Sequence, residues 1–252
     1  FFLGHFQVAA DLASGDDLPL AARSGWLGRA ARQLDRMRPP ERRSVLREAD
    51  LPRGLPTPSA LRRRVLLDGY WQAPRLFESI AELLRAELRP NFALGARARA
   101  LFEEIRSCDA AVAIHVRRGD YLLDPQANRH HGVLPADYYV RALGLIEAHV
   151  PAARFYLFSD APEQALASLP LPPERIRVIA LAAEPGGSAV VPDIEEFVLM
   201  SACRHQVIAN STFSWWAAWL NDHPGKRVIA PDRWFADGTP SDRLLPDDWW
   251  RV

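Results

Sequence analysis

Residues 111–121 read AVAIHVRRGDY, and this stretch decides the fold that we expect for the C-terminal part of the chain. Its first six residues, Ala111–Val116, form the short, mostly apolar run that is typical of a buried strand. The residues that follow, Arg117, Arg118 and Gly119, are polar or flexible, as in a loop that leaves a strand. The stretch therefore predicts a buried strand that ends in two adjacent arginines.

Similar short apolar runs recur after this strand, and helical patterns lie between most of them. The strand-like runs cover residues 155–158, 176–181, 207–209 and 228–230, and the helical patterns cover residues 135–149, 161–168, 193–202 and 213–221. Strands that alternate with helices predict an α/β fold, in which helices cover both faces of a parallel sheet. Such sheets bind ligands at the carboxyl ends of their strands, so polar residues at those ends are the candidates for a site.

The N-terminal part of the chain has a different composition. Residues 23–64 contain twelve arginines against four acidic residues, together with prolines that interrupt any long helix. This basic excess is compatible with a solvated surface, with a surface that faces phospholipid, or with an acidic partner. Farther on, we expect an extended segment at residues 65–71, a helix that begins near Pro74 and a second helix at residues 95–107.

The overall composition is that of a soluble globular protein. The 252 residues include 48% hydrophobic and 25% charged side chains, and 31 basic residues balance 31 acidic ones. The neutral balance disfavours a nucleic-acid-binding protein, because such domains carry an excess of Lys and Arg. The two cysteines of the chain, Cys108 and Cys203, are too few for a disulfide scaffold and are compatible with a reducing compartment.

Three of the predicted strand ends carry polar groups that suit an anionic ligand. Arg117 and Arg118 follow one strand, and a guanidinium group can hold phosphate oxygens through two hydrogen bonds; the alternative is a surface pair beside an aspartate. Asp160 follows the next strand, where it suits a ribose or a base, or caps the following helix. Residues 210–214 open a helix, whose N-terminus suits phosphate as well as ordinary capping. Together the three ends indicate a nucleotide site.

Motifs for several other ligands are missing from the sequence. No Asp-x-Asp pair is present to hold Mg²⁺ on a nucleotide diphosphate, so a cationic clamp would have to replace the metal. Neither a Walker loop nor Gly-x-Gly-x-x-Gly occurs, and the adjacent His130 and His131 lack the spacing of a zinc site. Six of the eight tryptophans lie in the last 38 residues, where their spacing favours core packing over stacking on a sugar.

Four motifs in this order resemble glycosyltransferase family 11, the galactoside α-1,2-fucosyltransferases, in its bacterial branch. The motifs lie at residues 68–72 (DGYWQ), 115–121 (HVRRGDY), 158–160 (FSD) and 193–220, the last of which contains LMS and IANSTFSWW. The resemblance covers the chain from about residue 65 to its end. It departs from the family pattern at Ala161, where the family usually has a second aspartate.

The resemblance implies a GT-B fold with two Rossmann-like domains. Residues 108–252 would bind GDP-fucose, and residues 1–107 would form the domain on the acceptor side. The family normally opens with a strand and a Gly-Gly-Leu-Gly-Asn-Gln loop, whereas this sequence opens at Phe1 without such a loop. We therefore expect the N-terminal domain to be incomplete.

The activity that the resemblance implies is an inverting, metal-independent transfer of L-fucose from GDP-fucose to the 2-hydroxyl of a terminal galactose on a glycan. It also implies a role in bacterial lipopolysaccharide or capsule assembly, in the cytoplasm or peripherally on the inner face of the membrane, without a nucleic-acid partner. Two alternatives stay open: a fucosyltransferase of another linkage or acceptor, and a truncated protein that binds a nucleotide sugar without transfer.

The resemblance further implies roles for individual residues of this chain. Arg118 would contact the β-phosphate and act in catalysis, with Arg117 as its helper or structural support. Asp120 would be the base for the acceptor hydroxyl. The resemblance also implies that Asp160 binds the donor and that His115 and Asp193 lie near its guanosine. Around the pyrophosphate it implies Ser211, Thr212, Phe213 and Ser214.

Overall fold

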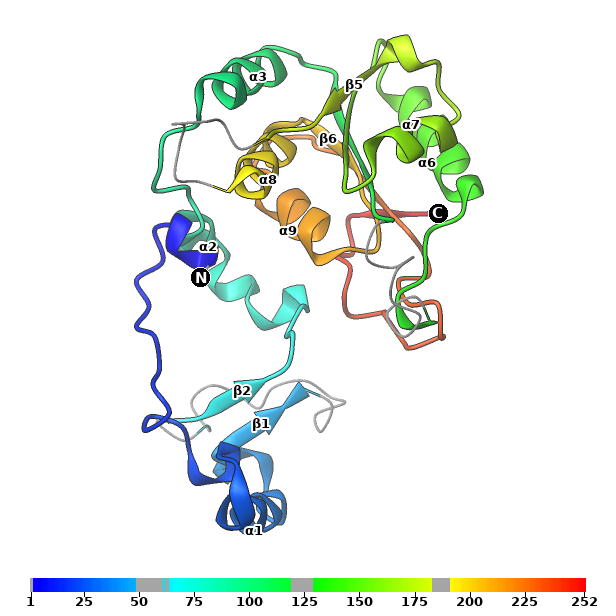
Figure 1. The fold of residues 1–252 in the computed structure, drawn as a ribbon. Coiled ribbons are helices and arrows are strands. Elements are labelled where there is room, and N and C mark those ends of the chain that lie inside the picture. The colour runs from blue at the N-terminus through cyan, green and yellow to red at the C-terminus, as the bar shows by residue number, and fades with distance from the viewer. Residues whose placement is uncertain (1, 49–60, 62–63, 119–128, 183–190) are drawn as a thin grey trace. The chain divides into compact units, whose positions relative to one another are not determined.

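The computed structural model describes residues 2–48, 61, 64–118, 129–182 and 191–252, and within them six parallel strands form one sheet (Figure 1). Their order across the sheet is β5-β4-β3-β6-β7-β8. The strands are β3 (Ala111–Val116), β4 (Arg154–Ser159), β5 (Ile176–Ile179), β6 (His205–Val207), β7 (Val228–Ala230) and β8 (Trp250–Arg251). The parallel α/β architecture that the alternating pattern predicted is therefore confirmed.

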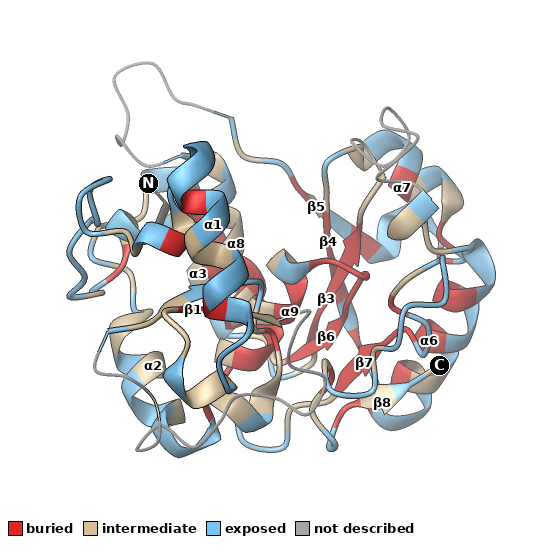
Figure 2. Cartoon of the chain, turned by 90° about the horizontal axis from the view of Figure 1, so that it is seen from below, coloured by how far each residue is buried: buried red, intermediate tan, exposed pale blue. Residues whose placement is uncertain are grey.

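Helices cover both faces of this sheet, because successive side chains of a buried strand point to opposite faces. On one face Val112, Ile114 and Val116 of β3 pack with helices α6 and α7. On the other face Ala111 and Ala113 of β3 pack with helices α3, α8 and α9. The bounds of these helices are α3 (Ala96–Arg106), α6 (Ala136–His149), α7 (Pro162–Ser168), α8 (Pro192–Ala202) and α9 (Thr212–Leu220). The buried sheet between the two helical layers is visible in Figure 2.

The strand order fixes where a ligand can bind. Counted from β3, the order is 3-2-1-4-5-6, which is the order of a Rossmann-type sheet. The chain turns from β3 toward β4 on one side, and it later returns to place β6 on the other side of β3, with Ile114 opposite Val207. The following helices α6 and α9 lie on opposite faces, so the chain diverges at the carboxyl ends of β3 and β6, which is where such sheets bind ligands. We call this place the switch point.

The predicted elements agree well with the structure in the sheet and less well before it. The strands at 111–116 and 228–230 and the four following helices lie where the periodicity placed them, within about one residue. The continuous helix expected from Pro74 is wrong at its start. Two 3-10 turns, η6 (Pro74–Leu76) and η7 (Glu78–Ile80), precede the helix α2 (Ala81–Glu87), because Phe77 between the turns has a non-helical φ of −130°.

The chain divides into two compact units. The small unit is Ala9–Ala81, and the large unit is Phe1–Val8 with Glu82–Val252. This division lies at residue 81, whereas the sequence indicated a boundary at residue 107, because α3 packs on α8 of the large unit. The acceptor-side role of residues 1–107 stays a prediction. In the part of the chain that the structure describes, no helix is both long and apolar enough to cross a membrane.

The small unit contains a helix that the sequence interpretation missed. Its elements are η2 (Leu20–Ala22), α1 (Gly25–Arg36), η3 (Pro40–Arg42) and the parallel strands β1 (Val45–Arg47) and β2 (Leu66–Asp68). The carboxylate of Asp35 joins α1 to β1, because it accepts hydrogen bonds from the backbone of Ser44 at 3.0 Å and of Val45 at 3.1 Å. Burial opposes ionisation of this carboxyl, yet these bonds hold its pKa below the ordinary value.

We predict that Asp35→Ala destabilises the small unit by about 2 kcal/mol at pH 7, because the buried N–H of Val45 and the partly buried N–H of Ser44 lose their acceptor. The matched control is Asp68→Ala, which removes a half-exposed ion pair with Arg47 and should cost at most about 1 kcal/mol. Urea denaturation measures both. Since the pKa of Asp35 is lowered, its contribution should disappear only as the pH falls into the acidic range below 4. Equal losses in the two variants would contradict this account.

Candidate functional site

The carboxyl ends of β3 and β4 are joined by Asp160. Its carboxylate accepts a hydrogen bond from the backbone N–H of Arg118 at 2.9 Å and forms an ion pair with the Arg117 guanidinium at 3.3 Å. Helix α7 has Ala161 as its N-cap, so capping by Asp160 is not observed. Asp160 therefore contacts both arginines that follow β3, and the role of Arg117 as helper or structural support of Arg118 stays a prediction.

Arg118 differs from its neighbour in the environment of its guanidinium. Its Nε is buried and has no hydrogen-bond partner within the described residues. A buried donor without a partner costs about 1–3 kcal/mol, so such a group is usually satisfied by water or by a ligand. This arginine is therefore the group at the end of β3 that is best placed to receive an anion.

Helix α9 begins across the switch point from Arg118. Ser211 is its N-cap residue, and neither Ser211 nor Thr212 donates a side-chain hydrogen bond to another described residue. The first backbone N–H groups of the helix are free of intrahelical partners and carry its positive dipole. Ser214 is different: it is fully buried, and its hydroxyl donates to the carbonyls of Ala209 and Ser211 at 3.3 and 3.2 Å. Ser214 thus supports the turn and is not available to a ligand through its hydroxyl.

His115 and Phe213 pack together at the bottom of this region. The two ring centroids are 5.7 Å apart, and Phe213 also meets Phe197 of α8 at 5.4 Å. Burial, with the nearby Arg117 charge, lowers the pKa of His115 to about 3, so the imidazole is neutral at ordinary pH. Its Nδ1 is buried and has no hydrogen-bond partner in the part of the chain that the structure describes, so this nitrogen could bind a ligand.

Asp193 and Asp120 stand differently in the structure. Asp193 lies exposed in the first turn of α8, the helix whose Phe197 contacts Phe213. Asp120 lies outside the described residues, so its role as a base stays a prediction. The next turn of α8 carries Glu196, whose pKa burial raises to about 7 and whose carboxylate accepts the Leu181 backbone N–H at 2.8 Å.

Two positioning residues escaped the sequence interpretation. The side-chain amide of Asn210 donates to the carbonyls of His131 at 2.7 Å and Trp234 at 3.2 Å, and so ties two loops to the end of β6. The Tyr139 hydroxyl donates to the His115 carbonyl at 3.1 Å. In the sequence, Asn210 belongs to the polar motif at the predicted helix N-terminus, and no sequence signal distinguishes Tyr139 within the predicted helix at residues 135–149.

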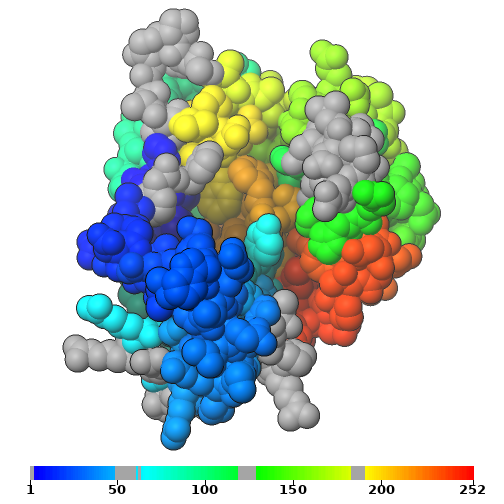
Figure 3. Space-filling view, turned by 60° about the horizontal axis from the view of Figure 1, so that its bottom comes forward, coloured from blue at the N-terminus to red at the C-terminus, as the bar shows by residue number. Residues whose placement is uncertain are grey.

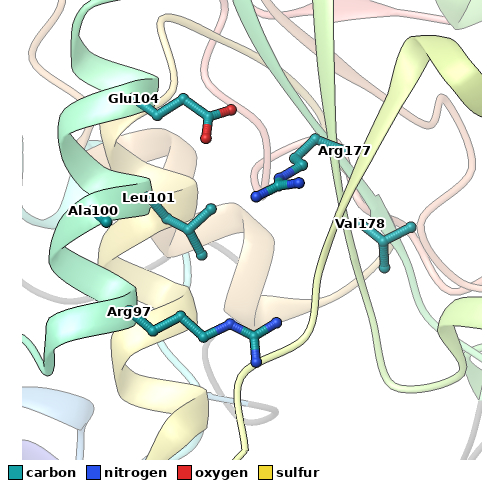
Figure 4. A pocket seen from close by; sticks show the side chains of 6 residues that line it. All are labelled: Arg97, Ala100, Leu101, Glu104, Arg177 and Val178. Carbon is teal, nitrogen blue, oxygen red and sulfur yellow. The ribbon is translucent and has the colours of Figure 1, made fainter.

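The exposed side of this region is seen in Figure 3, where the orange surface of α9 lies between the yellow surface of α8 and the green and red surfaces of residues 129–135 and the C-terminal loops. A pocket of about 230 Å³ lies between α3 and β5 (Figure 4). There the guanidinium groups of Arg97 and Arg177 point into the same space as the Glu104 carboxylate. This pocket involves no residue of the switch point.

A comparison with protein-family models decides the family. The model for glycosyl transferase family 11 matches residues 61–247, which is most of the chain and includes the whole switch point. The chain belongs to glycosyl transferase family 11. In this family 11 chain, Arg118 follows β3, and Ser211 and Thr212 follow the neighbouring strand β6, at the carboxyl ends where Rossmann-type sheets bind nucleotides.

Curated relatives agree with the family 11 assignment. The O-antigen biosynthesis glycosyltransferase WbnK of Escherichia coli is 39% identical over 54% of this chain and 43% of its own length. An alpha-1,2-colitosyltransferase of Escherichia coli is 29% identical over 73% of this chain and 61% of its own length. A galactoside alpha-(1,2)-fucosyltransferase 1 of Leontocebus fuscicollis is 27% identical over 61% of this chain and 42% of its own length. The chain thus spans less than two thirds of the length of each.

We predict that the His115 ring stays neutral from pH 8 to pH 5, because its burial keeps the pKa near 3. Histidine-labelled protein, with the signal assigned through His115→Gln, would show this in an NMR titration. Since the unfolded chain takes up a proton near pH 6.5, this histidine should lower the free energy of unfolding as the pH falls below that value. A midpoint between pH 6 and pH 7 for the His115 signal would contradict the buried placement.

Proposed function

We propose that this family 11 chain belongs to an inverting glycosyltransferase of GT-B type, which moves L-fucose from GDP-fucose to the 2-hydroxyl of a terminal galactose on a glycan. The observation that carries the proposal is the Nε of Arg118, which is buried and has no hydrogen-bond partner among the described residues, on the strand next to the one that leads into the N-terminus of α9. Support also comes from the names of the relatives, two of which are transferases that form α-1,2 linkages.

The chemistry of such a transfer suits these groups. The acceptor oxygen attacks the anomeric carbon, the bond from that carbon to the phosphate oxygen breaks, and GDP leaves with the electron pair. Negative charge therefore grows on the diphosphate as the bond breaks. Arg118 and the α9 N–H groups would stabilise that charge more in the transition state than in the ground state, which accelerates the reaction.

The remaining roles follow the same proposal. Asp120 would accept the proton of the acceptor hydroxyl, and its contribution would be modest because GDP is a good leaving group. His115 and Asp193 would contact the guanosine. We infer a metal-independent reaction, because the sequence lacks an Asp-x-Asp pair and the cationic clamp of Arg118 and α9 can balance the diphosphate charge.

A second donor deserves testing beside GDP-fucose, because one relative that covers 73% of the chain is named for colitose. The alternatives from the sequence also remain under test: a different linkage or acceptor, and binding of a nucleotide sugar without transfer. The cellular location, in the cytoplasm or peripherally on the inner membrane, stays a prediction that fractionation of cells into soluble and membrane parts would decide.

For donor binding, we predict that Arg118→Ala weakens the affinity for GDP by roughly 30- to 100-fold. This is the equivalent of about 2–3 kcal/mol for a charge-assisted hydrogen-bonded contact. The matched control is Arg204→Ala, which removes an arginine from an exposed pair with Asp109. This control should bind GDP within about twofold of the wild-type chain. Calorimetric titration measures all three proteins. Equal GDP affinity for Arg118→Ala and the wild type would remove the phosphate assignment.

For turnover, we expect GDP-fucose and lactose to give a product fucosylated at O2 of galactose, with inversion at the anomeric carbon, in the presence or absence of EDTA. NMR of the product reads both the linkage and the anomeric configuration. Another linkage, or faster turnover with GDP-colitose, would replace the proposed specificity. Tight GDP binding without any turnover would instead favour the binding protein, and a loss of turnover with EDTA would contradict the metal-free reaction.

A further inference from the structure

A second concave surface lies on the large unit, at the ends of α8 and α9 that are remote from the switch point. The cavity has a volume of about 720 Å³ and is bounded by α2, residues 88–94, α3 and the C-terminal ends of α8 and α9. Helix α9 begins at the switch point and reaches the cavity with its last residue, Leu220. Its nine residues correspond to a length of about 13 Å, so the two places are separate.

The cavity gathers more positive than negative charge. Its lining has four cationic side chains, Arg85, Arg89, Arg106 and Lys226, and two carboxylates, Glu82 and Asp222. The Glu82 side chain is almost fully exposed and pairs with Arg85 at 2.8 Å, so it offsets little of the charge inside. The cavity therefore has an excess of cations in a chain whose overall formal charge is zero.

Two of the arginines have donors without a hydrogen-bond partner among the described residues. The Arg85 guanidinium lies over the Trp219 ring, 4.7 Å from its centroid, and its Nε is buried without a hydrogen-bond partner. The Arg89 side chain is exposed, and it makes no hydrogen bond or ion pair with another residue that the structure describes. The stack on Trp219 fixes the direction of Arg85, so a ligand would meet a pre-oriented guanidinium.

The other two cations stand at the wall of the cavity. An Arg106 nitrogen lies 2.9 Å from Nε2 of His223, and Lys226 donates to the carbonyls of Ala218 and Asn221 at 2.8 and 2.7 Å. Lys226 thus caps the C-terminus of α9. Burial, with the repulsion of Arg85 as a smaller cause, lowers the pKa of this lysine to about 8. An anion in the cavity would relieve that repulsion.

We propose that this cavity is a second ligand site of the large unit, which binds a small organic phosphate with its anionic group on Arg85, Arg89 and Arg106. Guanidinium groups suit phosphate because each can offer two parallel donors. The apolar part of the ligand would lie against Phe92 and Phe102, which line the same cavity. The volume falls within the range of known small-molecule sites. This site does not depend on the proposed transferase activity.

The chain offers a direct reporter for the test, because Lys226 is its only lysine. Protein labelled with [13C]lysine gives one set of lysine signals, which report on the cavity wall without chemical modification. The titration uses the Arg118→Ala background, in which the switch point has lost its proposed phosphate ligand, and two probes, phenyl phosphate and inorganic phosphate. We expect saturable shifts of the Lys226 signals, a rise in its pKa, and binding of phenyl phosphate tighter by roughly threefold or more.

Variants that remove matched numbers of positive charges distinguish a specific phosphate site from non-specific electrostatic attraction of phosphate to the protein. Arg89→Ser, and the double variant Arg89→Ser/Arg106→Ser, should weaken the binding of phenyl phosphate by about tenfold or more. The control Arg97→Ser/Arg177→Ser removes two arginines from the smaller pocket of the same unit and should change the affinity by less than about twofold. Arg89 is exposed, so its single variant keeps the test valid if the double variant unfolds. Lys226 signals that do not saturate, or equal losses in the two sets of variants, would overturn the site.

Discussion

The central position of β3 constrains the rest of the large unit. All six of its residues are buried, and it pairs with β4 on one side and with β6 on the other. The connection from β3 to β4 moves one way across the sheet and the connection from β6 to β7 moves the other way, so right-handed crossovers place their helices on opposite faces. The carboxyl ends of the two strands are then neighbours with diverging loops. Arg118 and the start of α9 therefore follow neighbouring strand ends.

The electrostatics of the switch point depend on which charges are already matched. Asp160 balances Arg117 and orders the backbone of Arg118, while burial keeps His115 neutral. Among the described residues at the end of β3, Arg118 is then the cation with a buried donor that lacks a hydrogen-bond partner. The formal charge of zero for the whole chain conceals this local excess, as it conceals the cationic cavity at the other end of α9.

Periodicity predicted the sheet well because β3, β4 and α6 are long enough for several side chains to repeat their pattern. It did not predict α1, because the exposed Trp26, Leu34 and Met37 and the many arginines obscure the apolar pattern of a helix. The buried Asp35 instead joins this helix to β1. The two-residue strand β8 was also missed, since so short a segment has no pattern of its own.

The sequence identified candidate residues of the switch point but could not distinguish their individual roles. It grouped Ser211, Thr212 and Ser214 as one phosphate-binding set, whereas only coordinates show that the Ser214 hydroxyl turns inward to the Ala209 carbonyl. It weighed Asp160 as a ligand for the nucleotide or as a helix cap, and the structure shows a clamp between two strand ends. Roles of this kind depend on side-chain directions that a local pattern does not contain.

The central claim is that the diphosphate of the donor lies between the ends of β3 and β6. Amide chemical shifts of the labelled chain, recorded with and without GDP, test this claim most directly. The account predicts the largest changes at the backbone N–H groups of Arg117, Arg118, Thr212 and Phe213. It predicts small changes at His205 and Val228, which lie at the amino ends of β6 and β7. Changes concentrated away from the two strand ends, with the α9 amides unmoved, would contradict it.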